Sequence, residues 1–373
     1  MGRGCRRLAP NNMPVRMLPR RAIRVLACLL AAALLIAGCG GDSGSSGSGD
    51  EAEASSRPAP PKSAFPSAAG KTLQEVVKEA DAPSPLVVSP AAMVFYEGRN
   101  RYPFGVFEPD KTPVSDAEVA LYIAKVPRTQ PGAKNGEEAR GATARAQKEA
   151  LEAPATGPFP AAIETIQTEP AFRAQTTTSD PDAATVVYVT ELPFASEGEW
   201  RVAALIRDDG EVTGALLPSA VVDEFARIPR PGEKAPLIHT PTAEDAGDDL
   251  SEITTRVPPD TQNQVDFADV LGRKPVVLLF ATPQFCQSRV CGPVVDVAEQ
   301  VKEEHGEEAE FIHMEIFNEN DPSKGVRPQV RAYHLPTEPW VFAIDRQGTI
   351  RTAIEGAFGV EQLTEAVEGV TGG

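Results

Sequence analysis

Two cysteines, Cys286 and Cys291, follow a strongly apolar stretch of this chain. The stretch before them, Val276–Ala281, is continuously apolar, which is typical of a strand buried on both faces of a helix-covered sheet. In such sheets the carboxyl ends of the strands usually present the chemistry. Thiols at that position can attack a disulfide, form one, or bind a soft metal ion. The pair is therefore the first candidate for a functional site.

The N-terminus has the pattern of an export signal. Four arginines between residues 16 and 24 precede the apolar run Val25–Ala37, which spans 13 residues. A run of this length fits the core of a signal peptide and is shorter than the roughly 18 residues that a membrane-spanning helix needs. We therefore expect a signal peptide over residues 1–38, although a short buried helix would give the same run.

Residues 35–39 read Leu-Ile-Ala-Gly-Cys and resemble the lipobox of bacterial lipoproteins. The resemblance implies that Cys39 is acylated and holds a mature lipoprotein on the extracytoplasmic face of the cell membrane. A plain secretory signal is the alternative. Cys5 and Cys28 would leave with the signal, so that only Cys286 and Cys291 remain to pair. In an oxidising compartment such a pair should form a disulfide or cycle through one.

Length and charge limit the class of protein. The chain has 373 residues, enough for two domains with separate cores. Its net charge is −17, and it becomes −24 once the seven arginines of residues 1–38 are removed. An acidic surface argues against nucleic acid and anionic lipid headgroups as partners, although a generally acidic set of host proteins accounts for the charge equally well. We expect no cofactor and no resident metal.

By composition the first half divides into a tether and a β-rich part. Residues 39–84 are rich in Gly, Ser, Ala and Pro, and we expect them to form a disordered tether. Residues 85–227 contain short β-type runs bounded by turn residues, which predicts a β-sandwich with a long surface loop at about 128–160. The expected strands are Ala92–Phe95, Arg101–Phe107, Glu118–Val126, Thr185–Leu192, Trp200–Arg207 and Val212–Leu217.

This β-rich part resembles the immunoglobulin-like sandwiches of exported bacterial proteins. Residues 197–202, Glu-Gly-Glu-Trp-Arg-Val, are similar to the last hairpin of those domains. The resemblance is one of pattern and implies an immunoglobulin-like domain that acts as a spacer or in docking. We find no catalytic or metal-ligating constellation in its sequence.

The second half begins after a breaker-rich segment. Four of the nine residues 228–236 are Pro or Gly, so we expect a linker over residues 228–264 and an α/β domain over 265–373, with its first segment from about residue 231. Strands and helices alternate there, with one terminal hairpin. The expected helices cover residues 266–271, 292–304, 326–333 and 360–370, and the expected strands cover 276–281, 311–316, 341–344 and 349–354.

The α/β part resembles thioredoxin-like proteins, in particular the membrane-tethered ones that handle disulfides outside the cell membrane. The resemblance covers about residues 231–373. It is based on a strand that ends at a cysteine pair, on Glu338-Pro339 before a later strand, and on the Asp-Arg-Gln-Gly turn at 345–348. It implies a cis peptide bond at Pro339, beside the cysteines. It also implies a thiol-disulfide oxidoreductase with a redox-active disulfide that acts on exported proteins.

The two thiols are expected to have different roles. Cys286, placed at the start of the helix, should be the attacking thiolate because the helix dipole and free backbone N–H groups stabilise negative charge there. Cys291, placed inside the helix, should resolve the mixed disulfide. Arg289 lies between them and either adds positive potential or is an ordinary solvated charge on the helix surface.

The spacing of the pair departs from the thioredoxin pattern, in which two residues separate the cysteines. Four residues separate Cys286 from Cys291. On an ideal helix a five-residue step places two Cα atoms about 8.7 Å apart, whereas a disulfide needs roughly 4.4–6.8 Å. The first helical turn must therefore be irregular, or must unwind, for the bond to close.

Glu338 is a second departure, because the residue before the cis proline in this family is usually small or apolar and faces the cysteines. A carboxylate beside the thiols would raise their pKa and slow their attack. We prefer an orientation of Glu338 toward solvent. The alternative is that Glu338 accepts the proton of the buried thiol.

Two other activities stay open. Atypical peroxiredoxins share the five-residue step, but residues 282–286, Thr-Pro-Gln-Phe-Cys, are one residue longer than their motif, and Pro339 stands where they carry an arginine. Copper chaperones of thioredoxin-like fold use two cysteines and a distant histidine. Of the four histidines here, His334 is nearest in sequence to the proline loop.

The last alternative is a protein without catalytic activity. A permanent structural disulfide between Cys286 and Cys291, in a lipoprotein that only binds partners, fits the wide spacing, the presence of Glu338 and the lack of an acidic residue in the strand at 276–281. A reduction potential below about −300 mV would favour this interpretation.

Overall fold

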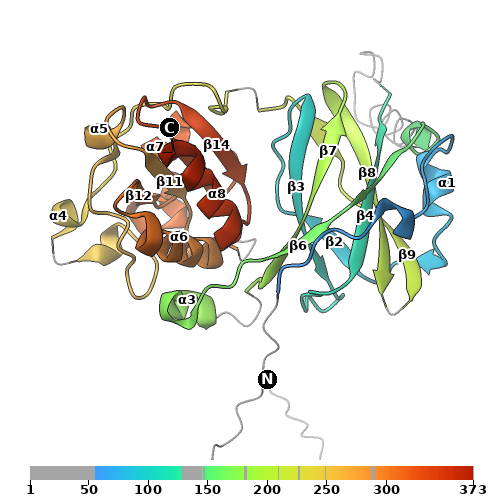
Figure 1. Cartoon of the computed structure of the whole chain (residues 1–373), viewed down its shortest axis with the longest axis horizontal. Coiled ribbons are helices and arrows are strands. Elements are labelled where there is room, and N and C mark those ends of the chain that lie inside the picture. Colours follow the sequence, from blue (N-terminus) through green and yellow to red (C-terminus); the bar gives the residue numbers. More distant parts are fainter. Residues whose placement is uncertain are drawn as a thin grey trace, which may run out of the picture. The chain divides into compact units, whose positions relative to one another are not determined.

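The structure, a computed structural model, describes residues 55–127, 145, 148–179, 183–208, 210–225, 227–247, 249–286 and 290–372. The predicted signal peptide, Cys39, Arg289, the first part of the predicted tether and most of the predicted loop at 128–160 lie outside these residues. Within the described part, no helix has the length and apolar character to cross a membrane. Residues 52–373 cluster as one compact unit, in which a β-rich part precedes an α/β part (Figure 1).

The β-rich part is a sandwich of two mostly antiparallel sheets. One sheet has the strand order β1-β9-β8-β4-β5, with β10 beside β8, and the other has the order β2-β3-β7-β6. Side chains of the two sheets meet in a shared apolar core, where Phe104 and Tyr188 of one sheet join Leu121 and Val202 of the other. The strands are β1 Ala82–Pro83, β2 Val87–Pro90, β3 Gly98–Phe107, β4 Glu118–Lys125, β5 Thr156–Pro160, β6 Ala162–Thr165, β7 Val186–Phe194, β8 Gly198–Asp208, β9 Glu211–Leu216 and β10 Ala220–Val222.

The second half of the predicted tether is folded. Leu73 and Val76, on the helix α1 (Leu73–Val77), are fully buried together with Tyr122 of β4. The helix begins with a capping box between Thr72 and Glu75. The expectation of disorder up to residue 84 is therefore wrong in this segment, because a few apolar side chains at helical spacing outweigh a polar average composition.

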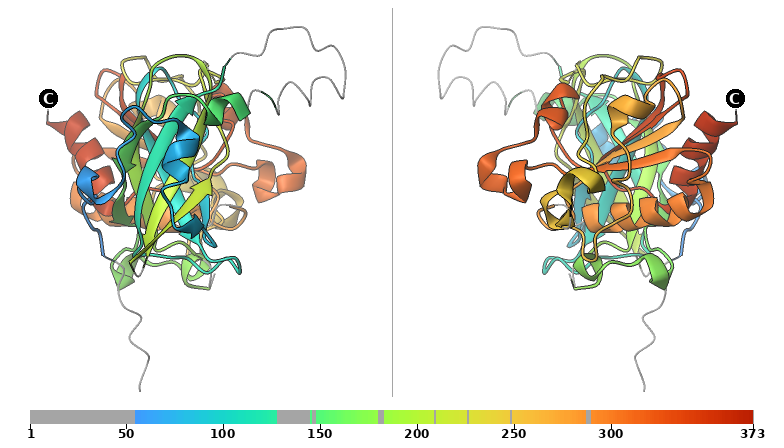
Figure 2. Two further views of the ribbon diagram at one scale, coloured as in Figure 1. Left: turned by 90° about the vertical axis from the view of Figure 1, so that its right-hand side faces the viewer. Right: turned by 90° about the vertical axis from the view of Figure 1, so that its left-hand side faces the viewer.

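The α/β part is a three-layer domain. Its sheet has the order β12-β11-β13-β14, in which β12 runs parallel and β13 antiparallel to β11. Helices α6 and α8 cover one face of the sheet, and α5 and α7 lie on the other (Figures 1 and 2). This arrangement agrees with the thioredoxin-like fold expected from the sequence. The elements are α5 Phe267–Val270, β11 Val276–Phe280, α6 Cys291–His305, β12 Glu310–Met314, α7 Pro328–Ala332, β13 Trp340–Ile344, β14 Ile350–Glu355 and α8 Val360–Thr371.

The strand that leads to the cysteines is buried on both faces. Val277 and Leu279 of β11 contact α6 and α8, while Leu278 and Phe280 pack on the opposite side with Tyr333. All five residues of the strand are fully buried. The prediction from the continuous apolar run is therefore confirmed, because β11 is a central strand between two layers of helices.

The sequence did not reveal several strands of the sandwich. β5 is rich in Pro and Gly, and β6 has only four residues, so neither has a long apolar run. β5 also falls within the region expected to be a loop. Residues 92–95 were expected to be a strand, but they make only an isolated bridge between Phe95 and Val222. Short strands are stabilised by pairing with neighbours, which local composition does not encode.

The segment expected to be a linker, residues 228–264, packs on the α/β part. Ile228, Ala235 and Ile238 join the apolar core beneath the sheet. Thr255 and Asp260 farther along are also buried. The segment includes two short helices, α4 (Ala243–Ala246) and η3 (Leu250–Glu252), and α5 begins shortly after it. Its polar composition reflects hydrogen bonds to the domain and does not indicate a free connection.

Residues 166–179 of the β-rich part leave the sandwich between β6 and β7 and contact α6. They contain η2 (Pro170–Phe172) and α3 (Gln175–Thr178), which lies beside α6 in Figure 1. A side chain at Gly292, the second residue of α6, would meet Thr177 Oγ1 at 2.9 Å. The helix that begins at Cys291 is therefore held by residues of both parts.

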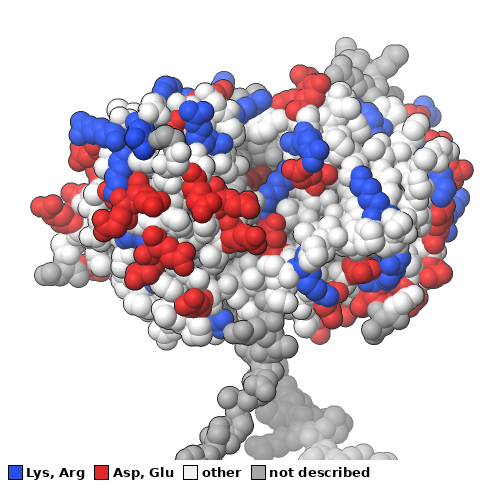
Figure 3. All heavy atoms as spheres, in the orientation of Figure 1, with Lys and Arg blue, Asp and Glu red and all other residues white. Residues whose placement is uncertain are grey.

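Acidic side chains gather over the helical layer of the α/β part. Figure 3 shows them on the face turned to the viewer, in the region of α6 and α8. Seven glutamates that are exposed lie on or just after these helices. They are Glu303, Glu304, Glu307, Glu308, Glu361, Glu365 and Glu368.

Candidate active site

The two cysteines form a disulfide at the carboxyl end of β11. The strand ends at Phe280, a turn over residues 283–285 follows, and Cys286 comes next. The Cα atoms of Cys286 and Cys291 are 5.9 Å apart, within the range of ordinary disulfides. The bond closes because Cys286 precedes the helix, so the five-residue step is not a helical one.

The helix starts within one residue of the expected range 292–304, but Cys286 lies outside it. Cys291 is its first residue and Val290 is the N-cap, so Cys286 is not at the helix start and the expectation that Cys291 lies inside the helix is corrected. Pro293 is the third residue of α6, where its missing N–H costs no helical hydrogen bond. This proline is the signal in the sequence that indicates a helix start close to residue 291.

The two sulfur-bearing residues differ in exposure. Cys291 is fully buried and belongs to the core between the sheet and α6, whereas Cys286 is partly exposed. The helix dipole and the free N–H groups of the first turn now act on Cys291 more directly than on Cys286. An exposed thiol beside a buried one is the geometry needed for attack by Cys286 and resolution by Cys291.

Glu338 lies beside the disulfide, and Pro339 follows it in the chain. The Glu338–Pro339 peptide bond is cis, as predicted, and the Pro339 carbonyl accepts a hydrogen bond of 2.9 Å from the N–H of Gly356. A carboxylate oxygen of Glu338 lies within 4.8 Å of both sulfur atoms. The preferred orientation of Glu338 toward solvent is therefore wrong. Burial, followed by the negative charge of Glu315, raises the pKa of Glu338 to about 7.

Glu315 is a buried acid that the sequence analysis did not find. It follows β12 directly, is fully buried, and accepts hydrogen bonds of 2.6 Å from both the N–H and the hydroxyl of Thr255. The same hydroxyl accepts a hydrogen bond of 3.2 Å from the N–H of Gln284, in the turn before Cys286. Thr255 thus connects the buried acid with the turn that precedes Cys286.

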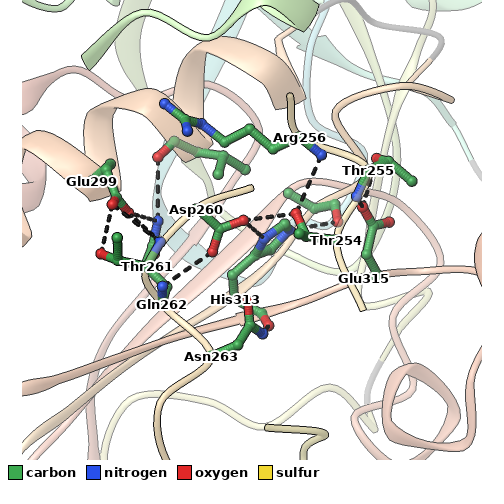
Figure 4. Close-up of polar contacts among 12 residues, drawn as sticks. Thr254, Thr255, Arg256, Asp260, Thr261, Gln262, Asn263, Glu299, His313 and Glu315 are labelled. Carbon is green, nitrogen blue, oxygen red and sulfur yellow. Dashed lines mark hydrogen bonds and ion pairs between the residues drawn. The ribbon is translucent and has the colours of Figure 1, made fainter. Parts of the chain in front are cut away.

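A buried ion pair between His313 and Asp260 contacts the end of β11 (Figure 4). His313 Nδ1 lies 2.9 Å from an Asp260 carboxylate oxygen, and its Nε2 lies 3.1 Å from the carbonyl oxygen of Ala281. Thr254 donates to the same carboxylate at 2.7 Å. Burial is the largest single effect and lowers the pKa of His313. The charge and hydrogen bond of Asp260, together with the charge of Glu315 and the hydrogen bond to Ala281, outweigh it and raise the pKa to about 9. The pKa of Asp260 is lowered by the same pairing, against the effect of burial.

A second buried pair holds α6. Arg256 Nε lies 2.9 Å from Asp296, on α6, and both side chains are almost completely buried. Arg256 also donates to the carbonyl oxygen of Phe172 at 2.7 Å, and Asp296 accepts from the N–H of Ala174 at 3.1 Å. Burial raises the pKa of Asp296, and the charge of Arg256 opposes that effect. The pair joins α6, the segment before the domain and residues 166–179.

The remaining predicted residues do not join the site. Arg289 lies outside the described residues. His334 is exposed and adopts a positive φ of 55° at the end of α7. Within the described residues, the group of potential metal ligands found together is Cys286, Cys291 and Glu338, and it contains no histidine. The copper interpretation therefore lacks the histidine it requires in this part of the chain.

Comparisons with known proteins gave matches among solved structures alone. No family model and no curated protein matches the chain. A putative thiol:disulfide interchange protein DsbE from Chlorobium tepidum is 16% identical, and the match covers 38% of this chain and 99% of that one with a TM-score of 0.28. A thiol:disulfide interchange protein of the thioredoxin family from Chlorobium tepidum TLS has the same identity and TM-score, with 38% and 97% covered.

Proposed function

We propose that the protein is a thiol-disulfide oxidoreductase whose reacting groups are Cys286 and Cys291. The observation that carries the proposal is the disulfide itself, in which a partly exposed cysteine is bonded to a fully buried one at the first residue of a helix. Pro339, which follows Glu338 in the chain, offers backbone groups against which a substrate chain docks. Glu338 places negative charge at the sulfurs and tunes their reactivity.

The proposed reaction proceeds in two exchange steps. In the reduced protein, the thiolate of Cys286 attacks one sulfur of a substrate disulfide, and the other substrate sulfur leaves as a thiolate. The Cys291 thiol then loses its proton and attacks the Cys286 sulfur, so that the internal disulfide forms and the second substrate thiolate is released. The substrate disulfide gains two electrons and the protein dithiol loses two. The reverse sequence oxidises a substrate dithiol.

We also propose where this reaction takes place. The lipobox-like sequence that ends at Cys39 supports a chain anchored by lipid on the extracytoplasmic face of the membrane. Its substrates would then be exported proteins with thiols or disulfides. The sandwich would be an immunoglobulin-like domain that spaces or docks the redox domain.

The test combines a measurement of the reduction potential with the capture of partners as mixed disulfides. The mature chain, purified in detergent micelles, is equilibrated with glutathione or dithiothreitol buffers, and a Cys291→Ser variant is used to capture partners as mixed disulfides. A reduction potential between about −120 and −270 mV with captured partners supports the proposal. A Cys286→Ser variant is the matched control and should capture none. A potential below about −300 mV without captured partners overturns the proposal.

One observation favours a second candidate, a non-catalytic docking protein with a structural disulfide. Val290, which lies between the cysteines, is buried in an apolar cluster with Ile166, Val187 and Ala357. A residue that is packed in this way next to Cys291 resists the movement that exchange requires. The measured potential separates the two candidates, because a structural disulfide is far harder to reduce.

A further inference from the structure

We propose that reduction of the disulfide creates a zinc site whose ligands are the thiolates of Cys286 and Cys291 and the carboxylate of Glu338. In the oxidised protein the sulfurs are bonded to each other and cannot bind a metal ion in this way. The site therefore exists in one redox state. The proposal goes beyond thiol-disulfide exchange and requires only that the disulfide can be reduced.

The positions of the three ligand atoms fit a zinc ion closely. The two sulfurs and one Glu338 oxygen all lie within 4.8 Å of one another. Tetrahedral zinc with bonds of about 2.3 Å to sulfur and about 2.1 Å to oxygen separates its ligand atoms by roughly 3.6–3.8 Å. Once the disulfide is broken, the sulfurs need to part and the carboxylate needs to approach by at most about 1 Å. Rotation of three side chains achieves this without movement of the backbone, because the two Cα atoms are already 5.9 Å apart.

Glu338 has no other partner among the described residues. Its carboxylate makes no hydrogen bond or ion pair with them, although it is partly buried. The neighbouring acid Glu315 differs, because two hydrogen bonds of 2.6 Å from Thr255 occupy it. A half-buried carboxylate that faces two sulfurs and has no donor lacks the usual compensation for lost water. A bound cation supplies that compensation and also relieves the repulsion between Glu338 and Glu315.

The ligand set selects the kind of metal. Thiolates exclude calcium and magnesium, which take oxygen ligands. Copper(I) prefers sulfur ligands and has little use for a carboxylate. Zinc accepts cysteine sulfur and carboxylate oxygen together, and three protein ligands leave the fourth tetrahedral position for water. The closest buried histidine, His313, is already engaged by Asp260 and Ala281.

Formation of the zinc site requires two electrons for the disulfide and releases the protons of the two new thiols. A dithiol partner gives two electrons and two protons to the disulfide and becomes a disulfide itself. In the experiment a phosphine gives the two electrons, takes an oxygen atom from water and becomes a phosphine oxide, and the water supplies the two protons. Zinc then replaces the protons of the two new thiols, and these protons pass to solvent. Because zinc binds the reduced form alone, it stabilises that form. Each tenfold excess of free zinc over its dissociation constant raises the reduction potential by about 30 mV.

The proposal is tested by metal titration of the mature chain in both redox states. The chain is reduced with a phosphine, which does not supply thiols, and zinc is titrated against a chromophoric chelator. Cobalt(II) serves as the spectroscopic probe, because thiolate ligation gives an intense charge-transfer band. We expect one zinc per reduced chain, no comparable binding by the oxidised chain, and a cobalt band in the reduced chain only.

Variants identify the ligands. Glu338→Gln should weaken zinc binding at least tenfold, and Glu365→Gln, at an exposed glutamate of α8, is the matched control that should not change it. Cys286→Ser and Cys291→Ser should each weaken binding at least a hundredfold, with the fold of each checked by near-ultraviolet circular dichroism. Equal zinc affinity of the reduced and oxidised chains overturns the proposal, as does an unchanged affinity in Glu338→Gln.

The outcomes also separate this proposal from the proposed oxidoreductase. Zinc binding is measured without substrate, and exchange is measured in the presence of a chelator. If exchange is found and zinc does not bind, the zinc site alone is refuted. If zinc binds the reduced chain and no substrate disulfide is ever exchanged, the oxidoreductase alone is refuted.

Discussion

Replacement of Asp260 by Asn should destabilise the α/β part strongly in a way that depends on pH. Asp260 is the charge partner of His313, whose side chain is completely buried below the end of β11. The substitution keeps the shape of the side chain and removes its charge. His313 then loses its bonded counter-ion and keeps only the smaller effect of the Glu315 charge, so that burial, the largest single effect, lowers its pKa.

The magnitude follows from the pKa of His313. That pKa is about 9 in the folded protein, against 6.5 for an ordinary histidine. A difference of this size corresponds to about 3 kcal/mol, at about 1.4 kcal/mol for each pH unit. Because the folded pKa is the higher one, this stability is fully present below about pH 6.5 and is lost as the pH rises to about 9. The variant should therefore lose about 3 kcal/mol at pH 6 and much less at pH 10.

The assay is urea unfolding at several pH values, followed by the fluorescence of Trp340 on β13. Trp200, in the sandwich, is replaced by Phe in all samples so that the signal reports on the α/β part. Asp269→Asn, at an exposed acid on α5, is the control and should change the unfolding free energy little. A loss below 1 kcal/mol at pH 6, or a loss that stays constant up to pH 10, would refute the reasoning.

Three further predictions concern the surroundings of the cysteines. Thr255→Val removes the hydroxyl that donates to Glu315, so it should cost about 2 kcal/mol in urea unfolding, and Thr255→Ser should restore most of this. Arg256→Met leaves the buried carboxylate of Asp296 without its ion pair and should cost about 3–5 kcal/mol by the same measurement; a loss near zero would mean that the pair is dispensable. The disulfide closes only a small loop, since the cysteines are five residues apart, so its reduction should lower the free energy of unfolding by only about 2 kcal/mol. Calorimetry of the oxidised and reduced chains measures this difference directly.

The sequence predicted those parts of the site that local pattern encodes. The apolar run that became β11, the alternation of strands and helices, and the proline at 339 are visible in consecutive residues. The range expected for α6, 292–304, was correct to within one residue at each end. Cys286 was nevertheless placed at the helix start, because the helical periodicity of Val294, Val295 and Ala298 does not define a first turn. Pro293 does define it, since a proline is tolerated only in that turn.

The buried polar residues could not be found in the same way. Glu315 and Thr255 are 60 residues apart, and His313 and Asp260 are 53 apart. Each pair forms only because residues 254–263 pack along the end of β12. That segment has the composition of a linker, and its polar side chains are buried with partners that lie far away in the chain. The sequence has no acidic residue in β11, whereas the buried acid of the structure, Glu315, directly follows the neighbouring strand β12.

The contact of residues 166–179 with α6 has a consequence for dissection of the protein. A fragment that begins near residue 230 would contain every element of the α/β part, yet Arg256 would lose the carbonyl of Phe172 and Asp296 would lose the N–H of Ala174. The apolar cluster around Val290 would lose Ile166 and Val187. The smallest fragment that keeps every contact of α6 therefore includes part of the sandwich, and it is larger than the α/β part that the sequence delimits.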